Sequence, residues 1–473
     1  FKIKDLIEAV SGRMIQGDIN ALVNPVSIDS RTLNPEDLFF ALTGPNFDGH
    51  NFILDAFCKE ASGIVISKKI NFLEKEKIKY EDKIIIEVED TLKALQDWAK
   101  FFKKEYKTYN VCVTGSTGKT TTKELTASIL CLKYSLLKTA GNYNNEIGIP
   151  LTLFKLKDNH KILITEMGMR GLGEIKDLTD LVKPDLAVVT NIGESHIGLL
   201  GSKENIFKAK SEILTSLNAD GIAVLNRDDS YYYKMRELVK DKRIITFGIK
   251  NISDIMASDI ELRNGKGMEF DLKIGNNQEK GLYFPLLGIH NIYNALAASA
   301  VAFAMDMDRD LIIKGLESFK PIPMHMYLID LCNGIKIVND SYNASPSSVK
   351  SALLTFTGIA GKNRKIVILG DMLELGEMTD FYHKQIGREI ANSSIDILIT
   401  LGDGGKLIAQ AALKNGMQDD CVFSFRKKNR EKLSQKLLSI LNPLDFLLLK
   451  ASHEMEMEKI QRYLQEKFRN RMK

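Results

Sequence analysis

Short apolar runs separated by polar, helix-forming stretches recur along most of the chain. In the middle of the chain, runs bounded by turn residues predict buried strands at 110–114, 161–167, 186–192 and 221–226. Such runs are typical of parallel strands covered by helices on both faces of a sheet. The apolar stretch 291–307 predicts the last helix of this segment. We therefore expect a parallel-sheet domain over residues 108–318.

A second alternating series follows, with predicted strands at 365–370, 396–402, 421–425 and 445–451 and helices at 381–392 and 430–441. This pattern indicates a separate doubly wound, Rossmann-like domain over residues 319–473. The first 107 residues mix short predicted strands, 64–67 and 83–88, with a helix over 91–106. The predicted fold class is α/β with three domains: a small N-terminal domain (1–107), a central domain (108–318) and a C-terminal domain (319–473).

Composition limits the class of protein. The 473 residues are 44% hydrophobic and 27% charged, with a net charge of +4, which is typical of a globular protein and does not argue for nucleic acid as a partner. No apolar run is long enough to span a membrane. The five scattered cysteines predict reduced core residues in a cytoplasmic protein. The chain starts at Phe1, so we expect a few leading residues to be missing.

The strand at 110–114 runs directly into a glycine-rich turn, V-C-V-T-G-S-T-G-K-T-T-T-K-E at 111–124. A strand, a glycine turn and a helix N-terminus form the setting of a phosphate-binding loop. Lys119 can neutralise the β and γ phosphates, and Thr120 can hold Mg²⁺. The usual glycine five positions before Gly118 is replaced by Val113. An ordinary strand-to-helix turn is the alternative, but Gly-Lys-Thr directly after a strand favours nucleotide binding.

The form T-G-x-x-G-K-[ST]-[ST] resembles the loop of the Mur ligase family and of its relative folylpolyglutamate synthase. The resemblance extends over almost the whole chain. It includes the stretches 27–53, K-T-A-G-N-Y-N-N-E-I-G-I-P-L-T-L at 138–153, K-A-K-S-E-I-L at 208–214, 288–298, 339–353 and I-L-G-D-M-L-E-L-G-E at 368–377. The first stretch resembles a UDP-binding segment that folylpolyglutamate synthase lacks. The last resembles the family member that acts on a UDP-N-acetylmuramoyl-tripeptide.

The resemblance implies an ATP- and Mg²⁺-dependent amide ligase of peptidoglycan precursor synthesis. The tripeptide carboxylate would be phosphorylated by ATP, and the amine of D-alanyl-D-alanine would attack the acyl phosphate. Nucleotide and substrate would sit between domains, whose closure assembles the site. We expect a cytoplasmic monomer that binds no nucleic acid and is not embedded in a membrane.

The resemblance also assigns residues to roles. The implied catalytic groups are Lys119, on the phosphates, and the ligands of two Mg²⁺ ions: Thr120 and Glu166 for one, His196 and Lys210 (as its carbamate) for the second. The implied nucleotide contacts are Gly115, Ser116, Thr117, Gly118, Lys119, Thr120, Thr121, His290, Asn291, Asn294, His325, Asp340, Tyr342 and Asn343. The implied substrate contacts are Ser27, Asp29, Ser30, Arg31, Thr43, Gly44, Asp48, Gly49, His50, Asn142, Asn144, Asn145 and Ser452.

Several of these residues have a simpler interpretation. The three asparagines could be turn formers, His196 could be a structural histidine, and Lys210 could be a solvated helix position. Glu166 ends an apolar strand, where an unpartnered charge is costly, so a metal or polar partner is favoured.

Three residues in two stretches depart from the family pattern. His325 stands where an arginine is usual, and K-A-S-H at 450–453 replaces K-G-S-R, which brings in Ala451 and His453. Histidine is mostly neutral at pH 7, whereas arginine is always charged. The hypothesis that follows is weaker nucleotide or substrate binding with an unusual pH dependence.

Three other functions stay open at this point. A family member that adds a single amino acid usually has a D-N-P-R-type motif, which is absent here. A P-loop ATPase would need no UDP-binding domain. A non-catalytic nucleotide-binding scaffold would not need Lys119, Glu166 and His196. The sequence does not distinguish lysine from diaminopimelate as the third residue of the tripeptide.

Overall fold

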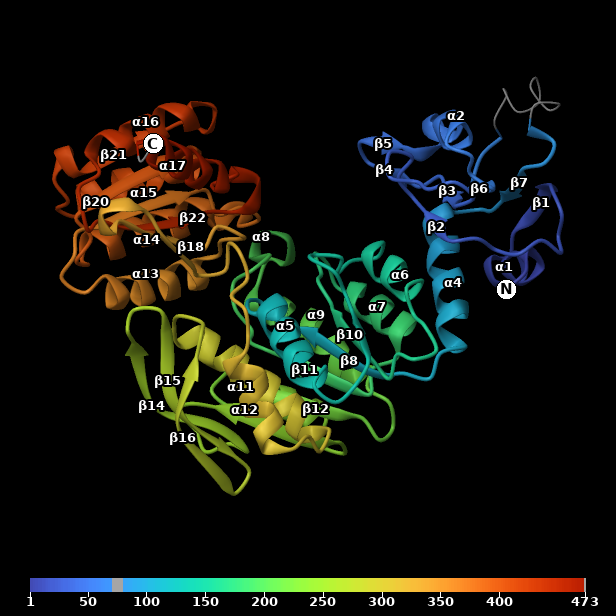
Figure 1. The fold of residues 1–473 in the computed structure, drawn as a ribbon, viewed down its shortest axis with the longest axis horizontal. Helices are drawn as coiled ribbons and strands as arrows, with labels where there is room; N and C mark the ends of the chain where they lie inside the picture. Colours follow the sequence, from blue (N-terminus) through green and yellow to red (C-terminus); the bar gives the residue numbers. More distant parts are fainter. Residues whose placement is uncertain (70–79, 472–473) are drawn as a thin grey trace. The chain divides into compact units, whose positions relative to one another are not determined.

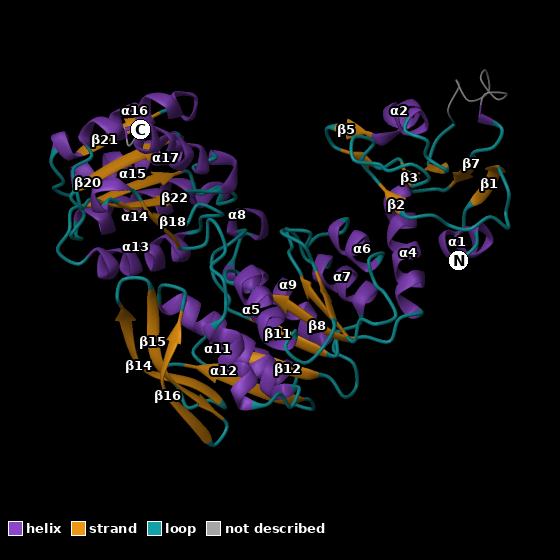
Figure 2. Ribbon diagram, in the orientation of Figure 1, coloured by secondary structure: helices purple, strands orange, loops and turns teal. Residues whose placement is uncertain are grey.

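The computed structural model describes residues 1–69 and 80–471. They form two compact units. The first comprises residues 1–111, 134–167 and 176–184, and the second comprises residues 112–133, 168–175 and 185–473. The boundary falls inside strand β8, Tyr109–Thr114. Figure 1 shows the ribbon and Figure 2 its secondary structure.

The first unit contains a sheet of strand order β1-β7-β6-β3-β2. Strand β1 is antiparallel to β7, and the other pairs are parallel. Its elements are α1 (Ile3–Val10), β1 (Arg13–Gln16), β2 (Val26–Ser27), β3 (Leu38–Phe40), β4 (Thr43–Gly44), β5 (Phe47–Asp48), η1 (Gly49–Phe52), α2 (Ile53–Cys58), β6 (Gly63–Ile66), β7 (Ile84–Glu87) and α4 (Thr91–Lys104). Helix α4 begins at Thr91 because the Asp90 carboxylate accepts hydrogen bonds from the backbone N–H groups of Leu92 and Lys93. It packs Trp98, 1% exposed, into the core of this sheet.

The first unit also contains part of a second sheet, in which the strands lie in the order β8-β10-β9. Strands β9 and β10 pair in parallel. The elements here are β9 (Leu136–Lys138), α6 (Gly148–Leu153), β10 (Ile162–Glu166) and most of α7 (Glu174–Val182). Strand β10 is buried along its whole length and ends at Glu166. The carboxylate therefore stands at the carboxyl end of a parallel strand, where α/β sheets bind ligands.

In the second unit the strands are ordered β16-β15-β14-β13-β12-β11-β8. Strands β11 to β14 pair in parallel, whereas β14, β15 and β16 form an antiparallel meander. The elements are α5 (Lys119–Leu130), β11 (Leu186–Val189), α8 (Ile197–Leu200), α9 (Lys203–Thr215), β12 (Ile222–Asn226), α10 (Tyr232–Leu238), β13 (Arg243–Gly248), β14 (Ile255–Arg263), β15 (Gly267–Ile274), β16 (Asn277–Phe284), α11 (Ile289–Ala304) and α12 (Arg309–Glu317).

The C-terminal sheet of the second unit has the order β17-β18-β22-β19-β20-β21, parallel except for β17. Alternate residues of β19 point into two different hydrophobic cores. Val367 and Leu369 belong to one core, and Ile366 and Ile368 belong to the other. Both faces are therefore covered by helices, as Figure 2 shows. The elements are β17 (Tyr327–Asp330), β18 (Lys336–Asn339), α13 (Pro346–Ala360), β19 (Lys365–Gly370), η4 (Gly376–Met378), α14 (Thr379–Ala391), β20 (Ile397–Leu401), α15 (Asp403–Lys414), β21 (Val422–Phe425), α16 (Arg430–Ile440), β22 (Phe446–Lys450) and α17 (Glu458–Arg471).

The α/β class predicted from the sequence is confirmed. The predicted strands at 365–370, 396–402, 421–425 and 445–451 correspond to β19 to β22 with shifts of at most one residue at either end. The antiparallel strands β14 to β16 were not predicted.

Candidate active site

The glycine-rich turn after β8 needs both of its glycines. Gly115 and Gly118 have φ values of 149° and 79°, which side chains rarely adopt. A Cβ at Gly115 would lie 1.8 Å from Thr190 Oγ1, and one at Gly118 would lie 2.2 Å from Asn294 Oδ1. The turn is thus a concave backbone segment that only glycine can form, in front of the N-terminus of α5.

Residues at the end of β11 hold the turn in place. Asn191 Oδ1 accepts from Thr117 N at 3.1 Å, and Thr190 Oγ1 donates to the Thr117 carbonyl at 2.6 Å. Ser116 Oγ accepts from Gly193 N at 2.7 Å. Asn191 and Thr190 were not among the predicted site residues, although they lie near the carboxyl end of the predicted strand 186–192.

Lys119 is the first residue of α5, and its Nζ donates to the Gly115 carbonyl at 2.9 Å. The ammonium group therefore lies beside the glycine turn. Thr120 and Thr121 follow in the first helical turn, where the helix dipole favours negative charge. These positions suit a phosphate group.

Lys210 has an unusual environment in the middle of α9. Its side chain is fully buried, and its Nζ has no hydrogen-bond partner among the described residues. Burial, followed by repulsion from Lys119, lowers the pKa of Lys210 well below its usual value. The sequence-based alternative of a solvated helix position is therefore wrong for this residue.

His196 precedes α8 with a left-handed backbone, φ 65°. Its Nδ1 lies 2.6 Å from Glu374 Oε2, a residue of the C-terminal segment 368–377. The imidazole and the carboxylate are thus in direct contact. This contact is the main reason that the pKa of Glu374 is lowered.

In the first unit, the predicted asparagines divide into two roles. Asn145 Oδ1 accepts from Gly148 N at 2.9 Å and so caps the start of α6. Asn144 Nδ2 instead donates to Glu166 Oε1 at 2.7 Å, and Glu166 is only 2% exposed. The turn-former interpretation thus describes Asn145, whereas Asn144 holds the carboxylate of a predicted metal ligand.

The predicted adenosine residues of α11 are joined to the phosphate loop. Asn291 Nδ2 donates to the Leu287 carbonyl at 2.9 Å, and Asn294 Nδ2 donates to Asn291 Oδ1 at 3.0 Å. Both asparagines are buried. Because Asn294 also faces Gly118, the two asparagines fix the helix against the loop.

His290, the second residue of α11, pairs through Nδ1 with Ser351 Oγ of α13 at 3.1 Å. Burial lowers the pKa of His290 to about 4. Between pH 6.5 and 4 the unfolded chain therefore binds a proton that the folded chain does not, so stability falls as the pH falls.

We expect His290→Asn to reduce this acid sensitivity. From a folded pKa of about 4 and an unfolded value of about 6.5, the loss of unfolding free energy at pH 5 relative to pH 7 should be about 2 kcal/mol smaller in the variant. Urea unfolding of both proteins at the two pH values measures it. An equal loss of unfolding free energy in wild type and variant would contradict a lowered pKa of His290 as the cause of the acid sensitivity.

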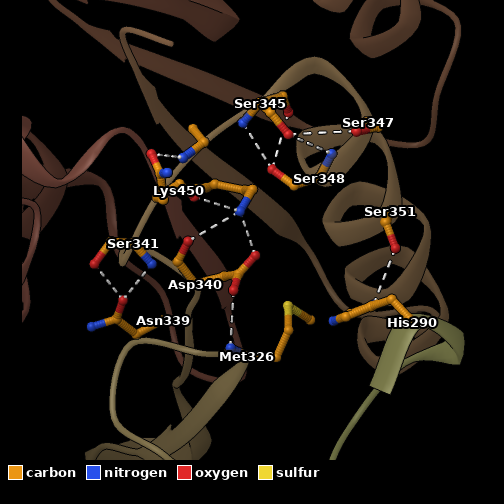
Figure 3. Close-up of polar contacts among 12 residues, drawn as sticks. His290, Met326, Asn339, Asp340, Ser341, Ser345, Ser347, Ser348, Ser351 and Lys450 are labelled. Carbon is orange, nitrogen blue, oxygen red and sulfur yellow. Dashed lines mark hydrogen bonds and ion pairs between the residues drawn. The ribbon is translucent and has the colours of Figure 1, made fainter. Parts of the chain in front are cut away.

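Asp340 and Lys450 form a buried ion pair that Figure 3 shows. Lys450 Nζ lies 2.6 Å from Asp340 Oδ2 and donates to the Asn343 carbonyl at 3.0 Å, while Asp340 Oδ1 accepts from Met326 N at 3.1 Å. Both carboxylate oxygens are therefore engaged within the protein. Lys450, which was not predicted as a site residue, fixes the whole segment that includes Asp340, Tyr342 and Asn343.

The two histidines that depart from the family pattern contact the same tyrosine. His325 stacks on Tyr342 with ring centroids 4.5 Å apart, and His453 approaches the same ring edge-on at 5.9 Å. Ala451, the third departure, is fully buried, and it fits because Gly370 has no side chain there: a Cβ at Gly370 would lie 2.7 Å from that of Ala451.

The predicted substrate residues of the N-terminal segment are largely bound to one another. Asp29 pairs with Arg31, which lowers the pKa of Asp29 to about 2. Asp48 contacts Lys68 and His50 Nδ1, and His50 Nε2 accepts from Ser67 N at 3.0 Å. His50 is buried with both ring nitrogens used, so it stabilises the loop from within.

The remaining residues of this set, Ser27, Ser30, Thr43, Gly44 and Gly49, lie around the same turns. Thr43 and Gly44 form β4, Ser27 ends β2, and Ser30 is buried. In the second unit Ser452 Oγ accepts from Leu373 N at 2.9 Å. The side chain of Asn142 stays a predicted substrate contact only.

Within residues 1–69 and 80–471, no three His, Cys, Asp or Glu side chains gather in a metal-binding arrangement. Besides Glu166 and His196, the predicted set includes other oxygen donors: the Thr120 hydroxyl, a modified Lys210 and phosphate oxygens. Mg²⁺ is commonly held by one or two protein groups together with substrate phosphates, so this donor set suits it.

Three family models match the chain in sequence order. The Mur ligase family catalytic domain matches residues 23–103, the Mur ligase middle domain residues 113–302, and the Mur ligase glutamate ligase domain residues 326–453. A UDP-N-acetylmuramoyl-tripeptide–D-alanyl-D-alanine ligase of Bacillus subtilis is 36% identical over 97% of each chain. The chain belongs to the Mur ligase family.

Solved structures of Mur ligases agree with this assignment. MurF from Acinetobacter baumannii is 29% identical and superimposes with a TM-score of 0.87 over 98% of this chain and 99% of that one. MurF ligase from Thermotoga maritima, solved in complex with ADP, is 26% identical with a TM-score of 0.82 over 95% and 99%. The family resemblance predicted from the sequence is thereby confirmed. None of the described helices of this Mur ligase combines the length and apolarity of a membrane span.

Proposed function

We propose that this Mur ligase joins D-alanyl-D-alanine to UDP-N-acetylmuramoyl-tripeptide at the expense of ATP. The observation that supports the proposal most is the 36% identity to a ligase of that name over 97% of the chain. The retained glycine turn with Lys119 supports ATP as the phosphate donor. We further propose three domains, 1–107, 108–318 and 319–473, because each family-model match lies within one of them.

In the proposed reaction the tripeptide carboxylate attacks the γ-phosphorus of ATP, and the bond to ADP breaks. The amine of D-alanyl-D-alanine then attacks the acyl carbon, phosphate leaves, and the amine loses a proton. Two anions must approach each other in the first step, so the ammonium group of Lys119 and the N-terminus of α5 would stabilise the transferring phosphoryl group.

Bound Mg²⁺ would neutralise charge on the phosphate oxygens. We propose Thr120 and Glu166 as ligands of one Mg²⁺, and His196 and carbamylated Lys210 as ligands of a second. Asn144 supports the assignment of Glu166, because its amide orients that carboxylate. Asn291, Asn294 and Asp340 would fix the elements that face the adenosine, since their side chains are already engaged within the protein.

The substrate residues in the N-terminal segment are proposed to bind the UDP portion, with the exposed side chain of Arg31 as an accessible group. We propose that the enzyme acts as a monomer in the cytoplasm, where ATP and UDP-linked precursors are available.

Phosphate release from Mg²⁺-ATP in four mixtures tests the proposal. They contain no acceptor, UDP-N-acetylmuramoyl-tripeptide alone, D-alanyl-D-alanine alone, and both. Release only with both substrates is expected. Release without either would favour a P-loop ATPase, and release with a single amino acid in place of the dipeptide would favour another member of the family.

We expect His325→Arg to lower the KM for ATP at pH 8 by up to about tenfold, the effect of one charge-assisted hydrogen bond. At pH 8 a histidine of ordinary pKa is neutral, whereas arginine keeps its charge and can still stack on Tyr342. The decrease in the KM for ATP should be smaller at pH 6, where histidine carries positive charge more often. An unchanged KM at pH 8 would contradict a role for this position in binding the phosphates.

A further inference from the structure

The side chain of His196 contacts a carboxylate from a distant part of the chain. Glu374 lies between β19 and η4, and its Oε2 is 2.6 Å from His196 Nδ1. The imidazole is mostly buried, with 19% of its side chain exposed, and the Glu374 side chain is 39% exposed. No sequence motif pairs these residues, which are 178 positions apart along the chain (374 − 196).

Both partners have backbone conformations that their side chains disfavour. His196 has φ 65° and Glu374 has φ 61°. The left-handed region costs a residue other than glycine about 1–2 kcal/mol, and neither position is glycine. Strain of this kind often marks residues kept for the chemistry of their side chains.

The segment that presents Glu374 is held by three different elements. Met372 N donates to His383 Nε2 of α14 at 3.0 Å, and Leu373 N donates to Ser452 Oγ after β22 at 2.9 Å. Asp371 Oδ1 accepts from Gly405 N in the first turn of α15 at 2.8 Å. The three consecutive residues before Glu374 are therefore each held by a hydrogen bond between a side chain and the backbone. These bonds fix the backbone from which the Glu374 carboxylate extends.

The segment of His196 is fixed against the same place. Gly198 N donates to the Glu374 carbonyl at 3.0 Å. A Cβ at Gly198 would lie 2.2 Å from Gly376 N, so the two backbones touch. Ile197 packs against the core beneath the C-terminal sheet. The ion pair is thus one part of a specific contact between the α8 turn and the loop before η4.

We propose that Glu374 is a positioning residue for His196: it holds the Nδ1 side of the imidazole, so that Nε2 is the nitrogen left to face a divalent cation bound with the nucleotide. Histidines that bind metals usually give their other ring nitrogen to a carboxylate or carbonyl, which fixes the ring orientation and raises the basicity of the ligand nitrogen. The inference rests on the proposed function, because that function supplies the metal–nucleotide ligand.

A simpler interpretation is an ion pair that only fastens α8 to the C-terminal loop. It predicts loss of stability on removal of the carboxylate and no specific effect on metal affinity. Mn²⁺ binding distinguishes the two, because Mn²⁺ substitutes for Mg²⁺ and is detected directly by electron paramagnetic resonance, without turnover.

The experiment compares wild type with Glu374→Ala, Glu374→Gln and the control Glu377→Ala, which removes an exposed carboxylate from the neighbouring η4. Each protein is titrated with Mn²⁺ in the presence of saturating ADP and bicarbonate, and thermal melting reports its folding. We expect the Mn²⁺ Kd to rise about tenfold or more in Glu374→Ala. Glu374→Gln should recover part of the affinity, since its amide oxygen can take the place of Oε2 beside Nδ1, and Glu377→Ala should match wild type.

The carboxylate should act through His196 alone. In a His196→Asn background, Glu374→Ala should therefore change the Mn²⁺ Kd by less than twofold. A wild-type Mn²⁺ Kd in folded Glu374→Ala and Glu374→Gln, or an equal loss with and without His196, would overturn the positioning role. A wild type that binds Mn²⁺ and ADP but releases no phosphate with both substrates would instead overturn the proposed function.

Discussion

Lys210→Ala is expected to lower the rate of ligation by about 10³-fold or more, in line with the loss of a charge-stabilising group from a phosphoryl-transfer site. The buried Nζ has no hydrogen-bond partner within the described residues, and its pKa is well below the usual value. Burial favours the neutral amine, which is the form that attacks carbon dioxide: R–NH₂ + CO₂ gives R–NH–COO⁻ and a proton. The resulting carbamate would place an oxygen ligand suited to Mg²⁺ where the buried amine has no partner.

This explanation makes activity depend on dissolved carbon dioxide. Wild-type ligation should fall in buffers freed of carbon dioxide and return when bicarbonate is added, while short carboxylates such as acetate should partly restore Lys210→Ala. Lys208→Ala is the matched control, because Lys208 is an exposed lysine of the same helix. Ligation by Lys210→Ala within threefold of wild type, with both proteins measured in the presence of bicarbonate and without added carboxylates, would rule out the carbamate.

Lys119→Met is expected to lower kcat by about 10³-fold while the protein stays folded. Its ammonium group lies 2.9 Å from the Gly115 carbonyl, beside the glycine turn, where it would stabilise the charge of the transferring phosphoryl group. Methionine keeps the length of the side chain and its helix propensity, so α5 should persist.

Single-turnover phosphate release with both substrates measures this effect, and ADP binding by calorimetry separates affinity from chemistry. The variant should lose more in the rate of phosphate release than in ADP affinity, because the charge that the lysine neutralises grows on the transferring group. Equal kcat in Lys119→Met and in the Lys208→Met control would show that the loop binds nucleotide without taking part in transfer.

The sequence predicted the fold best where strands are buried on both faces. Strand β19, K-I-V-I-L-G, is buried along its whole length, so its apolar run is continuous and its limits are sharp. Strand β16, N-Q-E-K-G-L-Y-F, has only two buried residues, Leu282 and Phe284. Its extended conformation depends on pairing with β15. The hydrophobic pattern of residues 277–284 alone does not show this pairing.

The candidate site shows the same limit. The phosphate loop was found from its local motif and Lys210 from the family resemblance, and their roles stay predictions until tested. Lys450 and Glu374 were missed because their roles arise from contacts with Asp340 and His196, far away in the sequence. The family pattern also gave no reason for histidines at both 325 and 453, whereas the structure shows that they share Tyr342.

The left-handed backbone conformations of His196 and Glu374 affect how much stability the protein loses when either residue is replaced. Glycine at either position would relieve about 1–2 kcal/mol of backbone strain. It would also lose about 0.5–1 kcal/mol to the greater freedom of the unfolded chain and up to about 1 kcal/mol from a partly exposed ion pair. These effects nearly cancel, so such variants should express and melt almost like wild type. Selection for folding alone would leave both residues free to change, and assays of abundance or thermal stability would overlook their replacement.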